Sequence, residues 1–503
     1  MNSTARYTSL ALLLATTAGC AVGPDFQRPA APAAHSYVAG TLPEQTASAP
    51  GFAGEAQRFA QGQQVQAQWW KAFGSPALDE LVAAALQANP DLKAAQAALR
   101  AARETAAAQR GAFWPSVDAG VNSTRQKTPG PLASPLVDSE VTLYTLHTAQ
   151  LSIGYVPDVF GANRRQVEAL SAEVDVQRFQ REAVYMTLVS NVVAAAIEEA
   201  SLRAQITATR DLIESAARLL DISRGQHQAG QIGGTDVAAQ EAALAQAQTS
   251  LPALEKQLAA QRNRLAVLAG RLPSEQAAQH VELASLTLPS ELPVSVPSSL
   301  VEQRPDIRAA ESQLHAASAQ IGVATAARLP NLTLTATLGS SALDFSQLFR
   351  SGSGFWSMGG DLLQPILRGG TLRHQQRAAE ANYDQAAAQY RSTVLTAFQN
   401  TADALQAIVS DAETLRTASA AEAAAKKSLA MAHRQRELGA TPQADLILAQ
   451  QTYQQQTLAL VQAQASRYTN TVALYLALGG WWHEPEATDG QTQAAGIARP
   501  DGG

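Results

Sequence analysis

This 503-residue sequence contains few cysteines and few aromatic residues, and it has no excess of basic charge. Its one cysteine, Cys20, excludes a disulfide within the chain. The formal net charge is −6 and no basic stripe occurs, which argues against nucleic acid as a partner. Aromatic residues make up only 5% of the chain, whereas Ala, Gln and Leu are abundant, so helices are favoured over compact mixed cores.

Two further absences narrow the function. No run of 18 apolar residues follows residue 20, so no helical membrane span is expected. His227, His433 and His483 show no metal-ligand spacing, and no H-E-x-x-H motif occurs. No Ser-His-acid grouping and no phosphate-binding loop stands out either. We therefore expect no metal, no cofactor and no catalytic residues.

The N-terminus has the features of a secretory targeting segment. Arg6 is followed by a short apolar core and by small residues up to Cys20, which is the pattern of a signal peptide over residues 1–19. A lone cysteine at this junction favours a bacterial lipoprotein, in which the Cys20 thiol carries the lipid. The alternative is an ordinary signal peptide with an incidental cysteine, because Thr17 stands where leucine is commonest in lipoproteins.

The rest of the chain contains one unit twice. Asn89-Pro90-Asp91 and Arg304-Pro305-Asp306 each open a segment that reaches a second proline 25 residues later, at Pro115 and Pro330. The offset stays between 208 and 215 residues along the two copies. A duplication with so long a period indicates one structural unit used twice.

The duplication divides the sequence into six parts. Residues 21–60 are rich in Pro, Ala and Gly, which predicts an extended tether before the first copy. The parts are a signal peptide (1–19), an N-terminal tether (20–75), a first repeat (76–270), a proline-rich linker (271–298), a second repeat (299–480) and a polar tail (481–503).

Each repeat is predicted to contain very long helices. Residues 163–229 pass without a proline and would span about 100 Å as one helix. Such helices must pack along one another, and their many Ala and Gln residues suit coiled-coil contacts. A filamentous coiled-coil scaffold is therefore one alternative. The expected helices are 76–112 with a break at Asn89-Pro90, 163–229, 235–269 with a kink at Pro252, 300–328, 371–438 and 443–478.

Two segments in each repeat alternate apolar and polar residues instead. Alternation with period two places one kind of side chain on each face of a strand. Segments of about ten residues with one apolar face are typical of outer-membrane barrel strands, although a half-buried soluble sheet has the same pattern. The apolar positions are Val117, Ala119 and Val121; Leu151, Ile153 and Tyr155; Leu332, Leu334, Ala336 and Leu338; and Trp356, Met358 and Leu362.

Four strands are too few to close a barrel, since about eight are the smallest useful number. An open sheet in lipid would leave backbone groups without hydrogen-bond partners, at a cost of several kcal/mol each. Two chains would supply eight strands around a filled lumen, and three would supply twelve strands with room for a pore. The strand count thus predicts an obligate oligomer if the strands lie in a membrane.

Two stretches resemble one known family. The residues from Cys20 to Pro29 (CAVGPDFQRP) are similar to the mature start of outer-membrane factor lipoproteins, the NodT-like efflux branch of the TolC-like proteins. The residues from Ser298 to Glu311, and the continuation from Ile321 to Pro330, resemble the same branch. The resemblance covers about residues 10–482.

This resemblance implies a mainly α fold with a small transmembrane β part. A homotrimer would form one twelve-stranded β-barrel in the bacterial outer membrane, continued by a helical barrel across the periplasm, with the linker in an equatorial belt. Ala21 after Cys20 permits sorting of the lipidated chain to the outer membrane. The implied function is the exit duct of a tripartite efflux system with a periplasmic adaptor and an inner-membrane pump. The exit duct of a protein or peptide secretion system is the alternative within this class.

The helix turns hold the candidate site residues. Gly230 and Gly439 reverse the chain between long helices, where glycine permits the positive φ that ends a helix. Asp236 and Asp445 each follow six residues later. In the family an aspartate at the place of Asp445 contributes to a periplasmic constriction, and its usual acidic companion three residues on is Leu448 here. The alternative is that both acids stabilise the first turn of the returning helix; we favour this for Asp236 and the constriction for Asp445.

Overall fold

The computed structural model describes residues 21–34, 36–128, 142–275, 280–438 and 440–480. Cys20, Gly439, the signal peptide and the tail 481–503 lie outside these residues. The chain forms two compact units, and each combines segments from both repeats. Within the described residues, the first unit comprises segments from 21–30, 97–178 and 309–392, and the second comprises segments from 31–96, 179–308 and 393–480.

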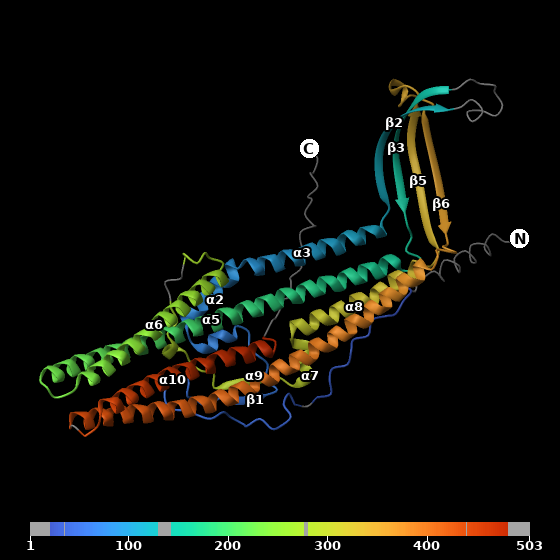
Figure 1. Cartoon of the computed structure of the whole chain (residues 1–503). Coiled ribbons are helices and arrows are strands. Elements are labelled where there is room, and N and C mark those ends of the chain that lie inside the picture. Colours follow the sequence, from blue (N-terminus) through green and yellow to red (C-terminus); the bar gives the residue numbers. More distant parts are fainter. Residues whose placement is uncertain (1–20, 35, 129–141, 276–279, 439, 481–503) are drawn as a thin grey trace, which may run out of the picture. The chain divides into compact units, whose positions relative to one another are not determined.

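The elements follow the duplicated order that the sequence predicts (Figure 1). The helices are α2 (Pro76–Ala88), α3 (Pro90–Arg110), α5 (Ala162–Gln228), α6 (Gly234–Leu268), α7 (Pro297–Gln303), α8 (Pro305–Ala326), α9 (Thr371–Glu437) and α10 (Gln443–Ala477). The strands are β1 (Arg58–Gln61), β2 (Ser116–Thr128), β3 (Thr142–Tyr155), β4 (Glu291–Val294), β5 (Asn331–Ala342) and β6 (Gly354–Leu363). Both α5 and α9 contain 67 residues, close to the predicted helices 163–229 and 371–438.

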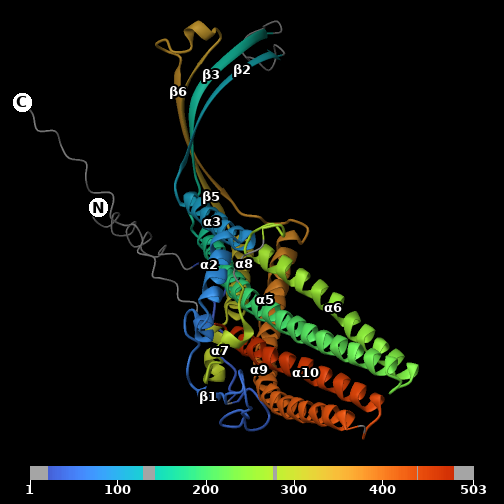
Figure 2. The same ribbon diagram turned by 90° about the vertical axis from the view of Figure 1, so that its left-hand side faces the viewer.

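One antiparallel sheet with the strand order β2-β3-β5-β6 dominates the first unit. The long strands lie side by side and twist strongly along their length (Figures 1 and 2). Each repeat contributes one hairpin, and the central β3–β5 pair joins the two repeats. The two outermost strands, β2 and β6, are each paired on one side only among the described residues.

The second repeat begins with two helices, so the prediction of a single helix over 300–328 was wrong. Helix α7 ends where Arg304 adopts an extended backbone (φ −81°, ψ 122°), because Pro305 disfavours a helical residue before it. The first repeat breaks at Asn89 in the same way. There the side-chain oxygen of Asn89 accepts hydrogen bonds from the backbone N–H groups of Asp91 and Leu92 at 2.9 and 3.1 Å, and so caps α3.

The segment expected to be an extended tether is held at specific positions. In the first unit, Gly23 lies so close to Gly322 of α8 that a Cβ on Gly23 would stand 2.4 Å from the Gly322 Cα. In the second unit, β1 pairs in parallel with β4 from the linker, and Phe59 lies opposite Leu292. Both of these side chains are buried. The tether and the linker therefore pack together as part of the fold.

Helix α5 contains an 18-residue window with a mean hydropathy of 1.3, enough for a membrane span by length and composition. Of this window, 61% is buried inside the protein, which is typical of a core helix. The window is therefore weak evidence for a helical span.

Helix α6 continues through Pro252, the position of the expected kink, as one element.

Candidate functional site: the sheet face and the helix-hairpin ends

The register of the four strands brings their apolar residues into rows on one face. Val117, Ile153, Ala336 and Met358 form one row, and Ala119, Leu151, Leu338 and Trp356 form the next. Trp356 is 73% exposed and Met358 is 79% exposed, so no other part of the described chain covers them. A broad apolar face open to its surroundings is the arrangement expected of a surface that contacts lipid.

The opposite face of the sheet is polar. Asp118, Ser152, Thr337 and Ser357 lie in one row across all four strands. The Thr148 and Ser341 hydroxyls, on neighbouring strands, are 3.3 Å apart and hydrogen-bonded. Such a face suits a water-filled lumen, since lumen-facing and lipid-facing residues alternate along barrel strands.

The first helix hairpin, α5–α6, turns at Gly230. This glycine has φ +71°, and its N–H donates to the His227 carbonyl at 2.9 Å. The next N–H, of Gln231, donates to the Gln226 carbonyl at 2.9 Å. This pair of hydrogen bonds is the Schellman arrangement, in which glycine at the left-handed position closes the helix end.

The second hairpin, α9–α10, closes with an equivalent bond. The Ala440 N–H donates to the Gln435 carbonyl at 2.8 Å, five residues back, as Gln231 does in the first hairpin. Gly439, the predicted turn residue, is outside the described part of the chain, so its conformation stays a prediction.

Asp445 lies in the first turn of α10 and is exposed. Its Oδ2 accepts a hydrogen bond of 2.8 Å from the Thr441 hydroxyl. Leu448, one helical turn later, is 62% exposed and lies on the same side of the helix. Asp236 occupies the matching first turn of α6 and is half-buried. Asp445 thus lies in the first turn of its helix, and both Asp445 and Leu448 are exposed.

The ends of the two hairpins are joined by a buried polar contact that the sequence did not indicate. Gln443 of α10 donates from Nε2 to the Gln240 Oε1 of α6 at 2.9 Å, and both side chains are buried. Close by, Leu446 and Ala449 of α10 pack with Ala432 and Leu219. Figure 2 shows the two hairpins side by side toward their turns. No spacing or motif marks Gln240 and Gln443, because each depends on a partner about 200 residues away.

Arg224, a charged residue close to the first turn, forms an ion pair within its own hairpin. Its Nη2 lies 2.7 Å from the Glu241 Oε1 of α6. Because both side chains are about half exposed, this ion pair contributes little to stability.

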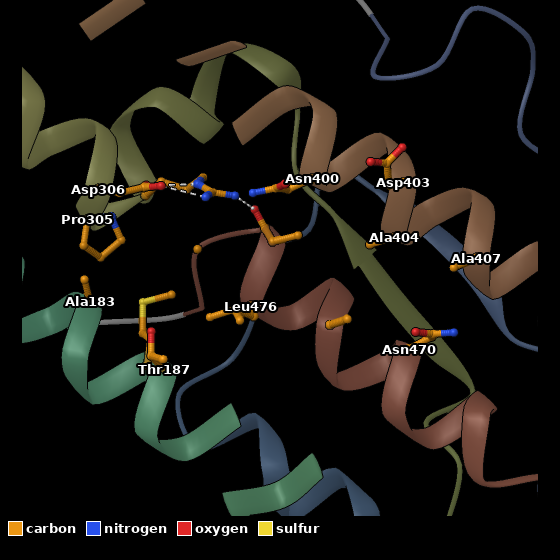
Figure 3. Close-up of a pocket in the computed structure, with 15 residues that line it drawn as sticks. Ala183, Thr187, Pro305, Asp306, Asn400, Asp403, Ala404, Ala407, Asn470 and Leu476 are labelled. Carbon is orange, nitrogen blue, oxygen red and sulfur yellow. Dashed lines mark hydrogen bonds and ion pairs between the residues drawn. The ribbon is translucent and has the colours of Figure 1, made fainter. Parts of the chain in front are cut away.

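A cavity of about 530 Å³ lies between α5, α9, α10 and the start of α8 in the second unit (Figure 3). Arg304 closes one end, with ion-pair and hydrogen-bond distances of 2.7 Å to Asp306 Oδ2 and to the Ala477 carbonyl. Alanines and Leu476 form much of the remaining wall. The Arg304 guanidinium therefore has a structural role here, since it joins the start of α8 to the end of α10.

Comparison with known proteins places these features in one family. Residues 81–271 and 296–480, most of both repeats, match the family described as outer membrane efflux protein. The pyoverdine export outer membrane protein OpmQ of Pseudomonas putida is 32% identical over 426 residues, covering 84% of this chain and 89% of the relative. The toluene efflux pump outer membrane protein TtgC of the same species is 30% identical over 496 residues, covering 98% and 99%.

Solved structures agree. The outer-membrane channel OprN is 28% identical, with a TM-score of 0.82 over 92% of this chain and all of OprN. The CmeC outer membrane channel of Campylobacter jejuni has a TM-score of 0.83 at 24% identity and shows the same fold. The chain therefore belongs to the outer membrane efflux protein family of TolC-like channels, and it is an efflux-pump channel of the outer membrane rather than an enzyme.

Proposed function

We propose that three copies of this chain form one barrel of twelve strands and one channel. The observation that carries this proposal is the pair of bare sheet edges, β2 and β6, in a sheet whose exposed face is apolar. In hydrocarbon each unpaired backbone group costs several kcal/mol, so β2 of one copy must pair with β6 of the next. Two copies would give a barrel whose lumen is filled by side chains, whereas three leave room for transport.

The trimer works as the exit duct of a tripartite system. A periplasmic adaptor and an inner-membrane pump deliver the substrate, and the pump supplies the energy. The names of similar proteins include pyoverdine, toluene and antibiotic export, which favours small organic molecules over proteins or peptides as cargo. A lipid on the Cys20 thiol anchors each chain to the outer membrane, with the long helices in the periplasm.

The hairpin ends, with Gly230 and Gly439 at their turns, form the periplasmic entrance and the adaptor docking surface. Asp445 and Leu448 narrow the pore there. Two observations support this role for Asp445 and Leu448. Both side chains are exposed on one side of α10, and they lie near the buried Gln240–Gln443 contact that joins the two hairpins. A threefold ring of carboxylates attracts cations, and the leucines add an apolar constriction. Asp236, half-buried in the other hairpin, stabilises the start of α6.

Cross-linking of the sheet edges tests the number of chains. Cysteines replace Val121 on β2 and Met358 on β6, which share the apolar face, and a flexible bis-maleimide joins neighbouring copies. We expect a ladder on denaturing gels that ends at three chains, because β2 of each copy lies beside β6 of the next. Each single-cysteine variant is the control and should give no covalent trimer. A ladder that ends at two chains would contradict the trimer.

Single-channel recording in a planar bilayer tests the constriction. We expect discrete conductance steps from the native protein, with larger steps and weaker cation preference in Asp445→Ala, because the variant removes a charged ring from the narrowest point. Asp236→Ala is the matched control: it removes an acid from the equivalent turn of the other hairpin and should leave the steps unchanged. Steps of equal size in Asp445→Ala and the native protein would place the constriction elsewhere.

A further inference from the structure

The apolar face of the sheet ends in basic residues at the β2–β3 hairpin. Alternation along β2 puts Arg125 and Lys127 on the same face as Val117 and Val121, and both cations are exposed. On β3, His147 lies on this face directly opposite Ser123. The acids of the sheet, Asp118 on β2 and Asp361 on β6, lie on the polar face instead. The apolar face therefore has a cationic margin on the side away from the helices.

The β5–β6 loop (343–353) folds over the same face. The Phe345 ring meets the His147 ring edge-on, with 5.7 Å between centroids. Within this loop Leu348 is buried, whereas Phe349 is 81% exposed. Arg350 follows Phe349 and is also exposed, while Asp344 is the acid of this loop. The loop thus adds an aromatic ring and a third cation to the margin of the apolar face.

A groove of about 560 Å³ lies beneath this loop. Its floor is a row of small residues, Ala149, Ser340 and Gly354, paired in register on β3, β5 and β6. Leu151, Leu338 and Phe349 supply the apolar walls. This mostly apolar lining suits a hydrocarbon chain, which is stabilised by burial against apolar side chains.

We propose that this groove and its cationic margin bind one phosphate-bearing anionic membrane lipid, with an acyl chain in the groove and the phosphate attracted by the positive charge of Arg125, Lys127 and Arg350 around it. No ion pair engages these three side chains within the described residues, so their charges are available to a headgroup. Cations at a membrane surface attract anionic lipids, by about fivefold in binding for each one. The site rests on the proposed barrel, because only then does this face contact lipid.

Quenching of Trp356 by brominated lipids tests the site, because Trp356 is exposed on this face two residues from Gly354. The protein is reconstituted into phosphatidylcholine vesicles with a small fraction of brominated phosphatidylglycerol or of brominated phosphatidylcholine. The Trp356→Phe protein supplies the signal of the other tryptophans, which is subtracted. We expect phosphatidylglycerol to quench at a mole fraction at least about tenfold lower than phosphatidylcholine does, given several cations at the site.

Two triple variants test which residues cause the preference for phosphatidylglycerol. Arg125→Ala/Lys127→Ala/Arg350→Ala should make the two lipids equivalent while quenching by phosphatidylcholine persists, which also shows that the variant is folded and inserted. The control, Arg416→Ala/Lys426→Ala/Lys427→Ala, removes three exposed cations from α9 and should retain the preference. Equal quenching by both lipids in the native protein, or an unchanged preference in the first variant, would overturn the lipid site. Absence of quenching by either lipid would instead contradict the barrel.

Discussion

Replacing Leu338 by Arg is expected to prevent insertion of the channel into the outer membrane, whereas Thr337→Arg is expected to be tolerated. The two residues are neighbours on β5 but belong to opposite faces: Leu338 lies in a row with Leu151 and Trp356, and Thr337 with Ser152 and Ser357. An arginine that faces lipid near the middle of the bilayer costs about 2–4 kcal/mol, and a trimer carries three of them. A lumen-facing arginine stays in water.

Insertion is measured as the fraction of protein that sediments with outer membranes and resists extraction by alkali. Trimer formation is measured from the intensity of the trimer band on native gels. Thr337→Arg is the matched control, because it introduces the same side chain one residue away. If both variants inserted equally well, Leu338 would not face lipid. Loss of insertion in both variants would show that β5 does not tolerate an arginine on either face.

Removing the Arg467 side chain is expected to release the N-terminal segment and destabilise the fold by several kcal/mol, because each buried acceptor left without a donor costs about 1–3 kcal/mol. Arg467 of α10 is 2% exposed. Its Nη1 donates to the Ala53 and Glu55 carbonyls at 2.9 and 3.0 Å. Its Nη2 donates to Thr46 Oγ1 at 3.2 Å and to Gln57 Oε1 at 2.9 Å. Burial lowers the pKa of Arg467 from its ordinary value, yet four acceptors keep the guanidinium in place.

Thermal unfolding of Arg467→Ala and limited proteolysis of residues 44–57 measure this effect. Arg467→Lys keeps the charge but cannot supply two donor atoms in a planar fork, so it should restore little of the stability. Arg416→Ala, which removes an exposed ion pair with Glu413 on α9, is the control and should unfold like the native protein. An unchanged melting temperature in Arg467→Ala would mean that the segment is held by other contacts, such as the β1–β4 pair.

The sequence alone was sufficient for features that depend on neighbouring residues. The bounds of α5 and α9 agree with the predicted helices 163–229 and 371–438 to within one residue, because glycines before and after these stretches interrupt a helix locally. Glycine at position 230 marks the α5–α6 turn through its access to positive φ. The strand alternation identified the apolar face because side chains point alternately to the two faces of any strand.

The tertiary structure decided which distant segments meet. Residues 21–60 are rich in Pro, Ala and Gly, so the sequence predicted an extended tether. Nothing in this composition indicated that β1 pairs with β4, which lies more than 200 residues further along the chain. The Arg467 and Gln240–Gln443 contacts have no local signal, since a side chain that bonds to a partner far along the chain leaves no spacing to recognise. The register of β3 with β5, which aligns the apolar rows of two repeats, is likewise a product of packing. Local periodicity thus determined the elements and their faces, whereas burial and hydrogen bonding between remote segments determined how those elements combine.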